Sequence, residues 1–90
     1  MNLETIKLNI KEIIVNDLDV GIKAADVNDE VSLYDDGLGL DSISIINFIV
    51  LLEKKFEVSF VDSEISAGLF RNINSLSNFL HTKLETKVSV

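Results

Sequence analysis

Apolar residues near the start of the chain recur at intervals of three and four positions. The series is Leu3, Ile6, Ile10, Ile13 and Ile14, and Leu18 extends it. A helix with about 3.6 residues per turn brings such positions onto one face, which it then buries. The pattern predicts a first helix over about residues 3–16.

From residue 17 to residue 41 this periodicity is lost. Acidic residues and glycines separate single apolar residues there, which predicts a long loop. A loop of this length is uncommon inside a compact domain. We therefore expect its isolated apolar side chains to attach it to the helices. These are Val20, Ile22, Val27, Val31, Leu33, Leu38 and Leu40. A short turn of helix within the loop fits the same pattern.

The most apolar stretch begins at Ser42 and predicts a second helix that runs to about Phe56. Lys54 and Lys55 lie in its last turn, where positive charge complements the helix dipole. At about 100° per residue its apolar positions fall into two groups. The group expected in the core is Ile45, Phe48, Ile49, Leu52 and Phe56. The second group, nearer Ser42, is Ile43, Ile46 and Val50.

A small helical domain seldom buries every side of one helix. We therefore expect the stripe of Ile43, Ile46 and Val50 to remain exposed and to bind partners. The alternative is that the long loop covers this stripe.

After residue 57 the helical pattern breaks and then resumes twice. Asp62 or Ser63 could cap a short third helix through Gly68, and Asn74 or Ser75 could cap a last helix. The apolar positions of this last helix are Leu76, Phe79, Leu80 and Leu84, and residues 86–90 are expected to fray.

The fold class follows from these elements. The chain has no proline and little alternation with a period of two, although its isoleucine and valine content favours strands. The prediction is an all-α fold, a small four-helix bundle with a long loop between the first two helices and a short third helix.

Ninety residues suffice for a single domain, ordered over about residues 3–85. The chain is 47% hydrophobic and 26% charged, which is typical of a globular protein and not of a disordered or membrane-spanning one. Its net charge of −7 disfavours nucleic acid and anionic membranes as partners and favours a basic protein surface. There is no cysteine, and the first residues lack the apolar core of a signal peptide, so a cytoplasmic location is expected.

The segment from Gly37 to Ser44 reads Gly-Leu-Gly-Leu-Asp-Ser-Ile-Ser and ends the loop. Its two glycines permit a turn that larger residues resist. Asp41 can accept free backbone N–H groups in the first turn of the following helix, and Ser42 lies at the positive end of that helix. A phosphate esterified to Ser42 would be stabilised there.

This string resembles the Asp-Ser-Leu signature of acyl carrier proteins and related peptidyl carrier domains, with Ile43 in place of the usual leucine. The similarity extends from about Leu3 to Leu84. It implies a four-helix fold of the acyl-carrier-protein type, in which 4′-phosphopantetheine is attached to Ser42. The thiol of this arm would hold acyl or aminoacyl groups as thioesters, so the protein would be a carrier and not an enzyme.

The resemblance also implies partners. Asp41 would cap the helix and help to engage the phosphopantetheinyl transferase. The surface that would dock this protein, as a monomer, onto acyl- or aminoacyl-loading and synthase enzymes comprises Ile43, Ile46, Asn47 and Val50. Asn47 and Lys54 stand where fatty-acid carriers usually have glutamate. This difference favours a specialised polyketide, nonribosomal peptide or lipid pathway over housekeeping fatty-acid synthesis. In some members of the family the core also opens to shelter the acyl chain.

Plainer alternatives stay open. Ser42 could be an ordinary first-turn serine, and the chain a non-covalent acidic helical adaptor that never carries the arm. Acidic runs at 17–21 and 26–30 suggest a calcium loop but lack the required glycine at the sixth and glutamate at the twelfth position, so no metal site is predicted. His81, the only histidine, has no cysteine to activate and is expected at the surface.

Overall fold

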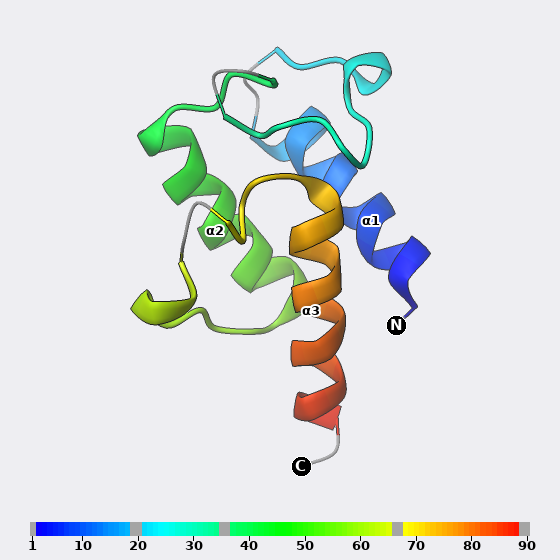
Figure 1. Ribbon diagram of the computed structural model, residues 1–90, viewed down its shortest axis with the longest axis vertical. Helices are drawn as coiled ribbons and strands as arrows, with labels where there is room; N and C mark the ends of the chain where they lie inside the picture. The colour runs from blue at the N-terminus through cyan, green and yellow to red at the C-terminus, as the bar shows by residue number, and fades with distance from the viewer. Residues whose placement is uncertain (1, 19–20, 35–36, 66–67, 89–90) are drawn as a thin grey trace.

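The computed structural model describes residues 2–18, 21–34, 37–65 and 68–88 (Figure 1). Within these ranges the protein is helical and has no strand, which confirms the predicted all-α class. The α-helices are α1 (Leu3–Glu12), α2 (Ser42–Phe56) and α3 (Ile73–Val88). The shorter helical turns are η1 (Ile13–Asp17), η2 (Ala24–Asp26) and η3 (Asp62–Glu64). None of the helices in the described ranges is long and apolar enough to span a membrane.

α1 begins where its sequence provides a cap. The Asn2 side-chain oxygen accepts a hydrogen bond from the Thr5 N–H at 2.8 Å. The helix continues directly into η1, a turn of π-helix in which the Leu18 N–H donates to the Ile13 carbonyl at 2.8 Å. The predicted helix over 3–16 is thus confirmed in extent, but its last turn is wider than an α-helical turn.

The loop between α1 and α2 is attached to the helices by buried apolar side chains. Of the seven residues predicted to attach the loop, Val27, Leu33 and Leu40 are buried. Ile22 and Leu38 are half-buried against the core, and Val31 is half-buried. Val20 lies outside the described residues. η2 is the expected turn of helix within the loop. In addition, the Leu33 N–H donates to the Arg71 carbonyl at 3.0 Å, which fixes the middle of the loop to the segment just before α3.

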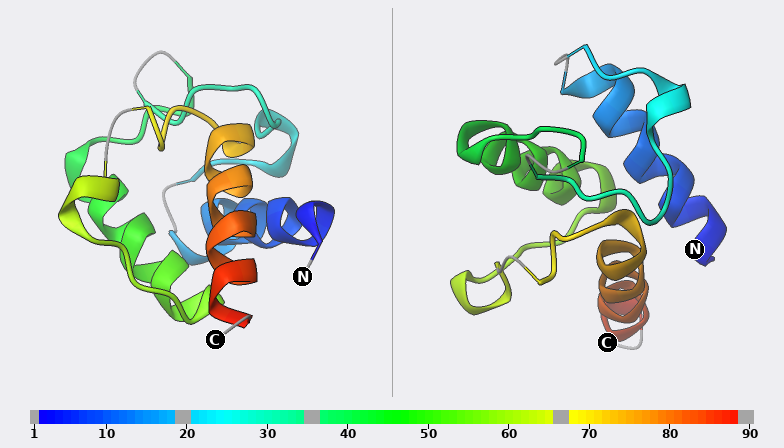
Figure 2. Two further views of the ribbon diagram at one scale, coloured as in Figure 1. Left: turned by 60° about the horizontal axis from the view of Figure 1, so that its bottom comes forward. Right: turned by 45° about the horizontal axis from the view of Figure 1, so that its top comes forward.

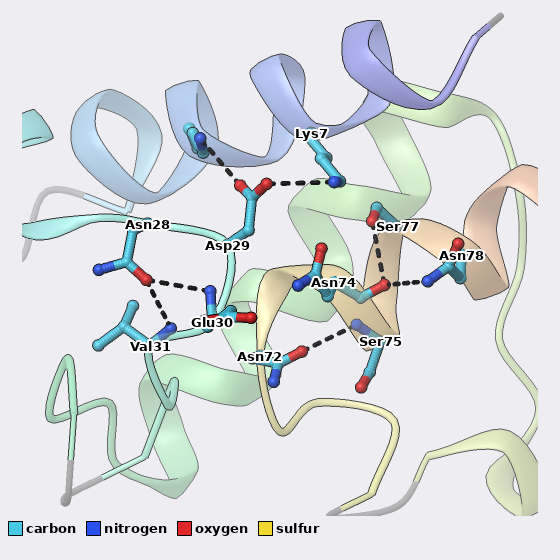
Figure 3. A network of polar contacts seen from close by, with 11 residues as sticks. Lys7, Asn28, Asp29, Glu30, Val31, Asn72, Asn74, Ser75, Ser77 and Asn78 are labelled. Carbon is cyan, nitrogen blue, oxygen red and sulfur yellow. Dashed lines mark hydrogen bonds and ion pairs between the residues drawn. The ribbon is translucent and has the colours of Figure 1, made fainter.

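Asp29 connects the same loop to two helices (Figure 3). Its carboxylate lies 3.1 Å from Lys7 Nζ and 3.0 Å from Lys11 Nζ, both on α1. Its backbone carbonyl accepts the Asn74 N–H of α3 at 3.0 Å. Hydrogen bonds from Lys11 and Lys7 lower the pKa of Asp29, so its carboxylate remains charged at neutral pH and holds the loop against α1.

α3 begins and ends at different residues from those predicted. Its cap is Asn72, whose side-chain oxygen accepts the Ser75 N–H at 2.9 Å, so the prediction of Asn74 or Ser75 as the cap is wrong. Asn72, Asn74 and Ser75 are all residue types that can cap a helix. The complete burial of Ile73 favours the start after Asn72. The helix continues to Val88, so the fraying predicted from residue 86 is not seen at residues 86–88. Ser89 and Val90 lie outside the described residues.

The predicted short third helix from Asp62 or Ser63 to Gly68 is not confirmed. In its place the structure has the single 3-10 turn η3, and Ser66 and Ala67 lie outside the described residues. The part of the chain that the structure describes therefore contains three α-helices instead of the four that were expected.

The core lies between the three α-helices. α1 crosses α3 at a steep angle, and η1 packs against α2 (Figure 2). Fully buried side chains from all three helices include Ile6, Ile10, Phe48, Leu52, Ile73, Leu76 and Leu80. The ring of Phe70, also fully buried, lies 6.4 Å from that of Phe48 and 5.9 Å from that of Phe60, so aromatic contacts join α2 to the segments between α2 and α3.

Candidate functional site

The start of α2 has the geometry predicted for it. Asp41 has an extended backbone and its carboxylate accepts the Ser44 N–H at 2.8 Å, so it is the N-cap. Ser42 is the first residue of the helix and is exposed. Hydrogen bonds from the backbone N–H and then the hydroxyl of Ser44 lower the pKa of Asp41. A negative charge therefore lies beside the Ser42 hydroxyl at neutral pH.

A tight turn before Asp41 places the serine at the surface. The Tyr34 carbonyl accepts both the Gly37 N–H at 2.9 Å and the Gly39 N–H at 2.8 Å. Gly39 has φ +79°, in the left-handed region, and a Cβ on Gly37 would collide with the Ser32 carbonyl. Both glycines are therefore required, as the sequence indicated.

α2 presents one face to the core and another to solvent. Its five predicted core positions are all buried, among them Phe48 and Leu52 with no exposed surface. The predicted second stripe is open, with Ile43 72%, Ile46 60% and Val50 42% exposed. Asn47 is exposed on the same helix. The loop does not cover this stripe, which excludes the alternative considered for it.

An apolar groove opens beside Ser42, with a volume of about 410 Å³. Its lining residues are Tyr34, Leu40, Asp41, Ser42, Ile45, Ile46, Ile49 and Ile65. Sequence reasoning missed this groove, because Tyr34 and Ile65 lie outside α2, in segments that show no helical periodicity. Burial raises the pKa of Tyr34, so its hydroxyl is protonated at neutral pH. The groove can accept the apolar part of a group attached at its rim.

The wall of the groove opposite α2 is held by an ion pair. Ile65 lines this wall, and the preceding residue, Glu64, accepts hydrogen bonds from Lys83 Nζ at 3.0 Å and from the Val61 N–H at 3.0 Å. The Lys83 ammonium group also lies 5.8 Å from the ring centroid of Phe60. Lys83 belongs to α3, so the Glu64–Lys83 ion pair ties the wall of the groove to that helix.

Replacing Glu64 with glutamine is expected to lower the melting temperature in a pH-dependent way. The hydrogen bond from the Val61 N–H and the contact with Lys83 lower the pKa of Glu64 below its ordinary value of 4.5. A carboxyl group with a lowered pKa stabilises the fold above that ordinary value and loses its contribution as the pH falls through the folded-state pKa. Melting curves should therefore show a difference between wild type and Glu64→Gln at pH 7 that shrinks below about pH 4.

Glu30→Gln is the control, because Glu30 is an exposed loop carboxylate. It should leave the melting temperature nearly unchanged at neutral pH. If the effect of Glu64→Gln is the same at pH 7 and pH 3, the charge of Glu64 does not hold the wall, and the proposed role of the ion pair is wrong.

Across the described ranges, no group of three or more His, Cys, Asp or Glu side chains could hold a metal ion. Asp19, part of the first acidic run, lies outside those ranges. His81 is partly exposed, and its Nε2 lies 3.4 Å from a carboxylate oxygen of Glu85 on the same helix.

A family model described as a phosphopantetheine attachment site matches residues 9–80, which is most of the chain. This chain belongs to the phosphopantetheine-binding carrier proteins. Its prosthetic group is 4′-phosphopantetheine, and carrier proteins of this family are not themselves enzymes.

Two solved structures resemble the carrier protein over most of its length. A holo acyl carrier protein from Nitrosomonas europaea is 32% identical, with a TM-score of 0.68, and the match covers 92% of this chain and 95% of that one. The second is a chain in the Bradyrhizobium japonicum structure of a glycine:[carrier protein] ligase complexed with glycylated carrier protein. It is 30% identical, with a TM-score of 0.61, and the match covers 84% of this chain and 93% of that one. The fold is therefore that of an acyl carrier protein, and proteins like this one act with partner enzymes.

Proposed function

We propose that the carrier protein bears 4′-phosphopantetheine on Ser42. The observation that supports this most directly is the exposed Ser42 hydroxyl at the first position of the 15-residue helix α2. Free backbone N–H groups and the helix dipole favour a phosphate at that end of a helix. The residues present therefore fit the prosthetic group, whose terminal thiol supplies the thioester chemistry when it is attached.

Asp41 has two roles in this proposal. Its hydrogen bond with the Ser44 N–H fixes the start of α2 and so the position of Ser42. Its charged carboxylate is exposed and can attract a basic group of the phosphopantetheinyl transferase that must approach Ser42. The serine itself needs no activating base in this chain, because the transferase performs the reaction.

The docking face, defined as Ile43, Ile46, Asn47 and Val50, would bind the enzymes that load and use the cargo. Three of its members are apolar and exposed along one side of α2, and contiguous exposed apolar patches often mark protein–protein interaction sites. The carrier protein would work as a monomer in the cytoplasm and use this face with each enzyme in turn. The acidic net charge suits basic enzyme surfaces.

The cargo is proposed to be an acyl or aminoacyl group of a specialised polyketide, nonribosomal peptide or lipid pathway. Asn47 and Lys54 are exposed on α2, so the helix presents no carboxylate at these two positions to enzymes that recognise charge there. The similar Bradyrhizobium japonicum carrier is glycylated, and the Nitrosomonas europaea relative is an acyl carrier protein. The apolar groove of about 410 Å³ beside Ser42 favours an acyl chain, which could lie along Ile45 and Ile49.

Mass spectrometry tests the carrier role. The purified protein is incubated with coenzyme A and a broad-specificity phosphopantetheinyl transferase, and it should gain the mass of one phosphopantetheine. Acyl or aminoacyl groups loaded onto the product should be released by hydroxylamine, as thioesters are. A protein that gains no mass would instead be the non-covalent acidic adaptor, the alternative function for this chain.

Replacing Ile46 with aspartate is expected to reduce kcat/KM for loading by the cognate enzyme about tenfold or more. The substitution places an unpaired charge in the centre of an apolar contact, where its desolvation opposes binding. Raising the ionic strength from low to physiological should slow loading of the wild type only modestly, because apolar contacts carry most of this interface.

Leu8→Asp is the matched control. Leu8 is also an exposed apolar residue, with 63% exposure, but it lies on α1 outside the docking face. It should leave loading unchanged. Steep salt dependence together with indifference to Ile46→Asp would mean that the loop acids between Asp26 and Asp36 recognise the enzyme instead.

A further inference from the structure

A small hollow lies beside the docking face, on the side of α2 that meets the end of α1. Its volume is about 220 Å³, and its lining residues are Asp17, Leu18, Asn47, Val50 and Leu51. Ligand pockets are usually about 300–1,000 Å³. The hollow is too small for such a ligand, but it suits one apolar side chain of another protein.

The π-helical turn η1 builds one wall of this hollow. Ile13 and Ile14 are fully buried and anchor the turn, while the Leu18 N–H donates to the Ile13 carbonyl at 2.8 Å. The turn packs against α2 and so sets Asp17 and Leu18 beside Val50. Single π-helical turns are rare and occur often at functional sites.

The distance to Ser42 places the hollow within reach of any enzyme that acts there. Val50 is eight residues after Ser42, which corresponds to about 12 Å along the helix. An interface of ordinary size buries about 800 Å² on each partner, a patch of roughly 16 Å radius. An enzyme centred on Ser42 therefore covers the exposed stripe from Ile43 to Val50 and reaches the hollow.

The negative charge of Asp17 lies at the rim of the hollow and favours a partner with a basic side chain there. Asp17 is exposed, and within the described ranges no lysine, arginine or histidine forms an ion pair with it. An apolar side chain that enters between Leu18 and Val50 would bring its neighbours close to this carboxylate. A lysine or arginine next to the apolar residue would then be attracted, and an acidic one repelled.

We propose that this hollow is a second docking point of the carrier protein. It receives an apolar side chain of the phosphopantetheinyl transferase, flanked by a lysine or arginine that pairs with Asp17. The inference rests on the proposed attachment of the arm to Ser42. It adds Asp17, Leu18 and Leu51 to the docking face and gives the π-helical turn a role in recognition.

Steady-state transfer of phosphopantetheine tests the proposal, with coenzyme A, a broad-specificity transferase and varied concentrations of the full-length carrier protein. Asp17→Lys should raise KM for the carrier about fivefold and leave kcat unchanged, because reversal of the charge replaces attraction with repulsion. The difference should shrink at high salt. Val50→Asp should also raise KM, with little loss of thermal stability, since Val50 is 42% exposed.

Asp26→Lys is the control, with the same change of charge on the exposed turn η2. It should change KM less than about twofold. Equal effects of Asp17→Lys and Asp26→Lys, or a Val50→Asp protein that is modified normally, would overturn the second docking point but leave the carrier role intact. A wild-type protein that is never modified would overturn both.

Discussion

Replacement of Ser42 by alanine is expected to abolish the attachment of phosphopantetheine completely. The hydroxyl oxygen of Ser42 is the atom to which the phosphate would be joined, so no partial activity should remain. The measurement is intact-protein mass spectrometry after incubation with coenzyme A and a transferase. Wild type should gain one phosphopantetheine and Ser42→Ala none.

Two controls separate chemistry from folding. Ser44→Ala, two residues further along α2, should still accept the arm, although the substitution removes the hydrogen bond from the Ser44 hydroxyl to Asp41. The free energy of unfolding of Ser42→Ala should lie within about 0.5 kcal/mol of the wild-type value, because the Ser42 side chain is exposed. If peptide mapping finds the arm on Ser44 or Ser32 instead, the assignment of the site to Ser42 is wrong.

Replacement of Phe48 by alanine is expected to lower the free energy of unfolding by about 3–5 kcal/mol, and Leu52→Ala by about 2–5 kcal/mol. Both side chains are fully buried, and Phe48 packs edge-on against Phe70 at 6.4 Å. Each substitution leaves a cavity that the rest of the core cannot fill. Since domains are stable by only about 5–15 kcal/mol, either variant should lose a large share of its stability in denaturant titrations.

Ile43→Ala is the matched control on the same helix. Ile43 is 72% exposed, so its truncation removes little buried surface and should cost much less. Its effect should be on transfer to partner enzymes instead. If Ile43→Ala and Leu52→Ala were equally destabilising, the division of α2 into a core face and a docking face would be wrong.

The sequence alone determined the features that depend on residues close together in the chain. α2 runs from Ser42 to Phe56 as predicted, because its cap Asp41 and its apolar period lie within the helix or next to it. The turn before Ser42 needs glycine at positions 37 and 39, and only local sterics are involved. The start of α2 and the place of Ser42 as its first residue were therefore predictable from the sequence.

Features that depend on distant residues were not readable in this way. In place of the predicted third helix the structure has a single turn, η3, and this segment is held by contacts with α2 and α3 that its local sequence does not predict. The Phe60 N–H donates to Glu53 of α2 at 2.8 Å, and Glu64 pairs with Lys83 of α3. α3 starts at Ile73, which is fully buried, ahead of both caps that its local pattern suggested.

The groove and the hollow belong to this second class. Tyr34 and Ile65 meet α2 beside Ser42, and Leu18 meets Val50 at the other end of the stripe. A pattern in one segment shows which of its faces is apolar, since that depends on helical geometry. Only the packing of segments far apart in the sequence decides whether that face is covered, left open or hollowed, because burial depends on what lies opposite. For this carrier protein the sequence determined the start of α2 at Ser42, the proposed attachment site, and the tertiary structure decided the surfaces around it.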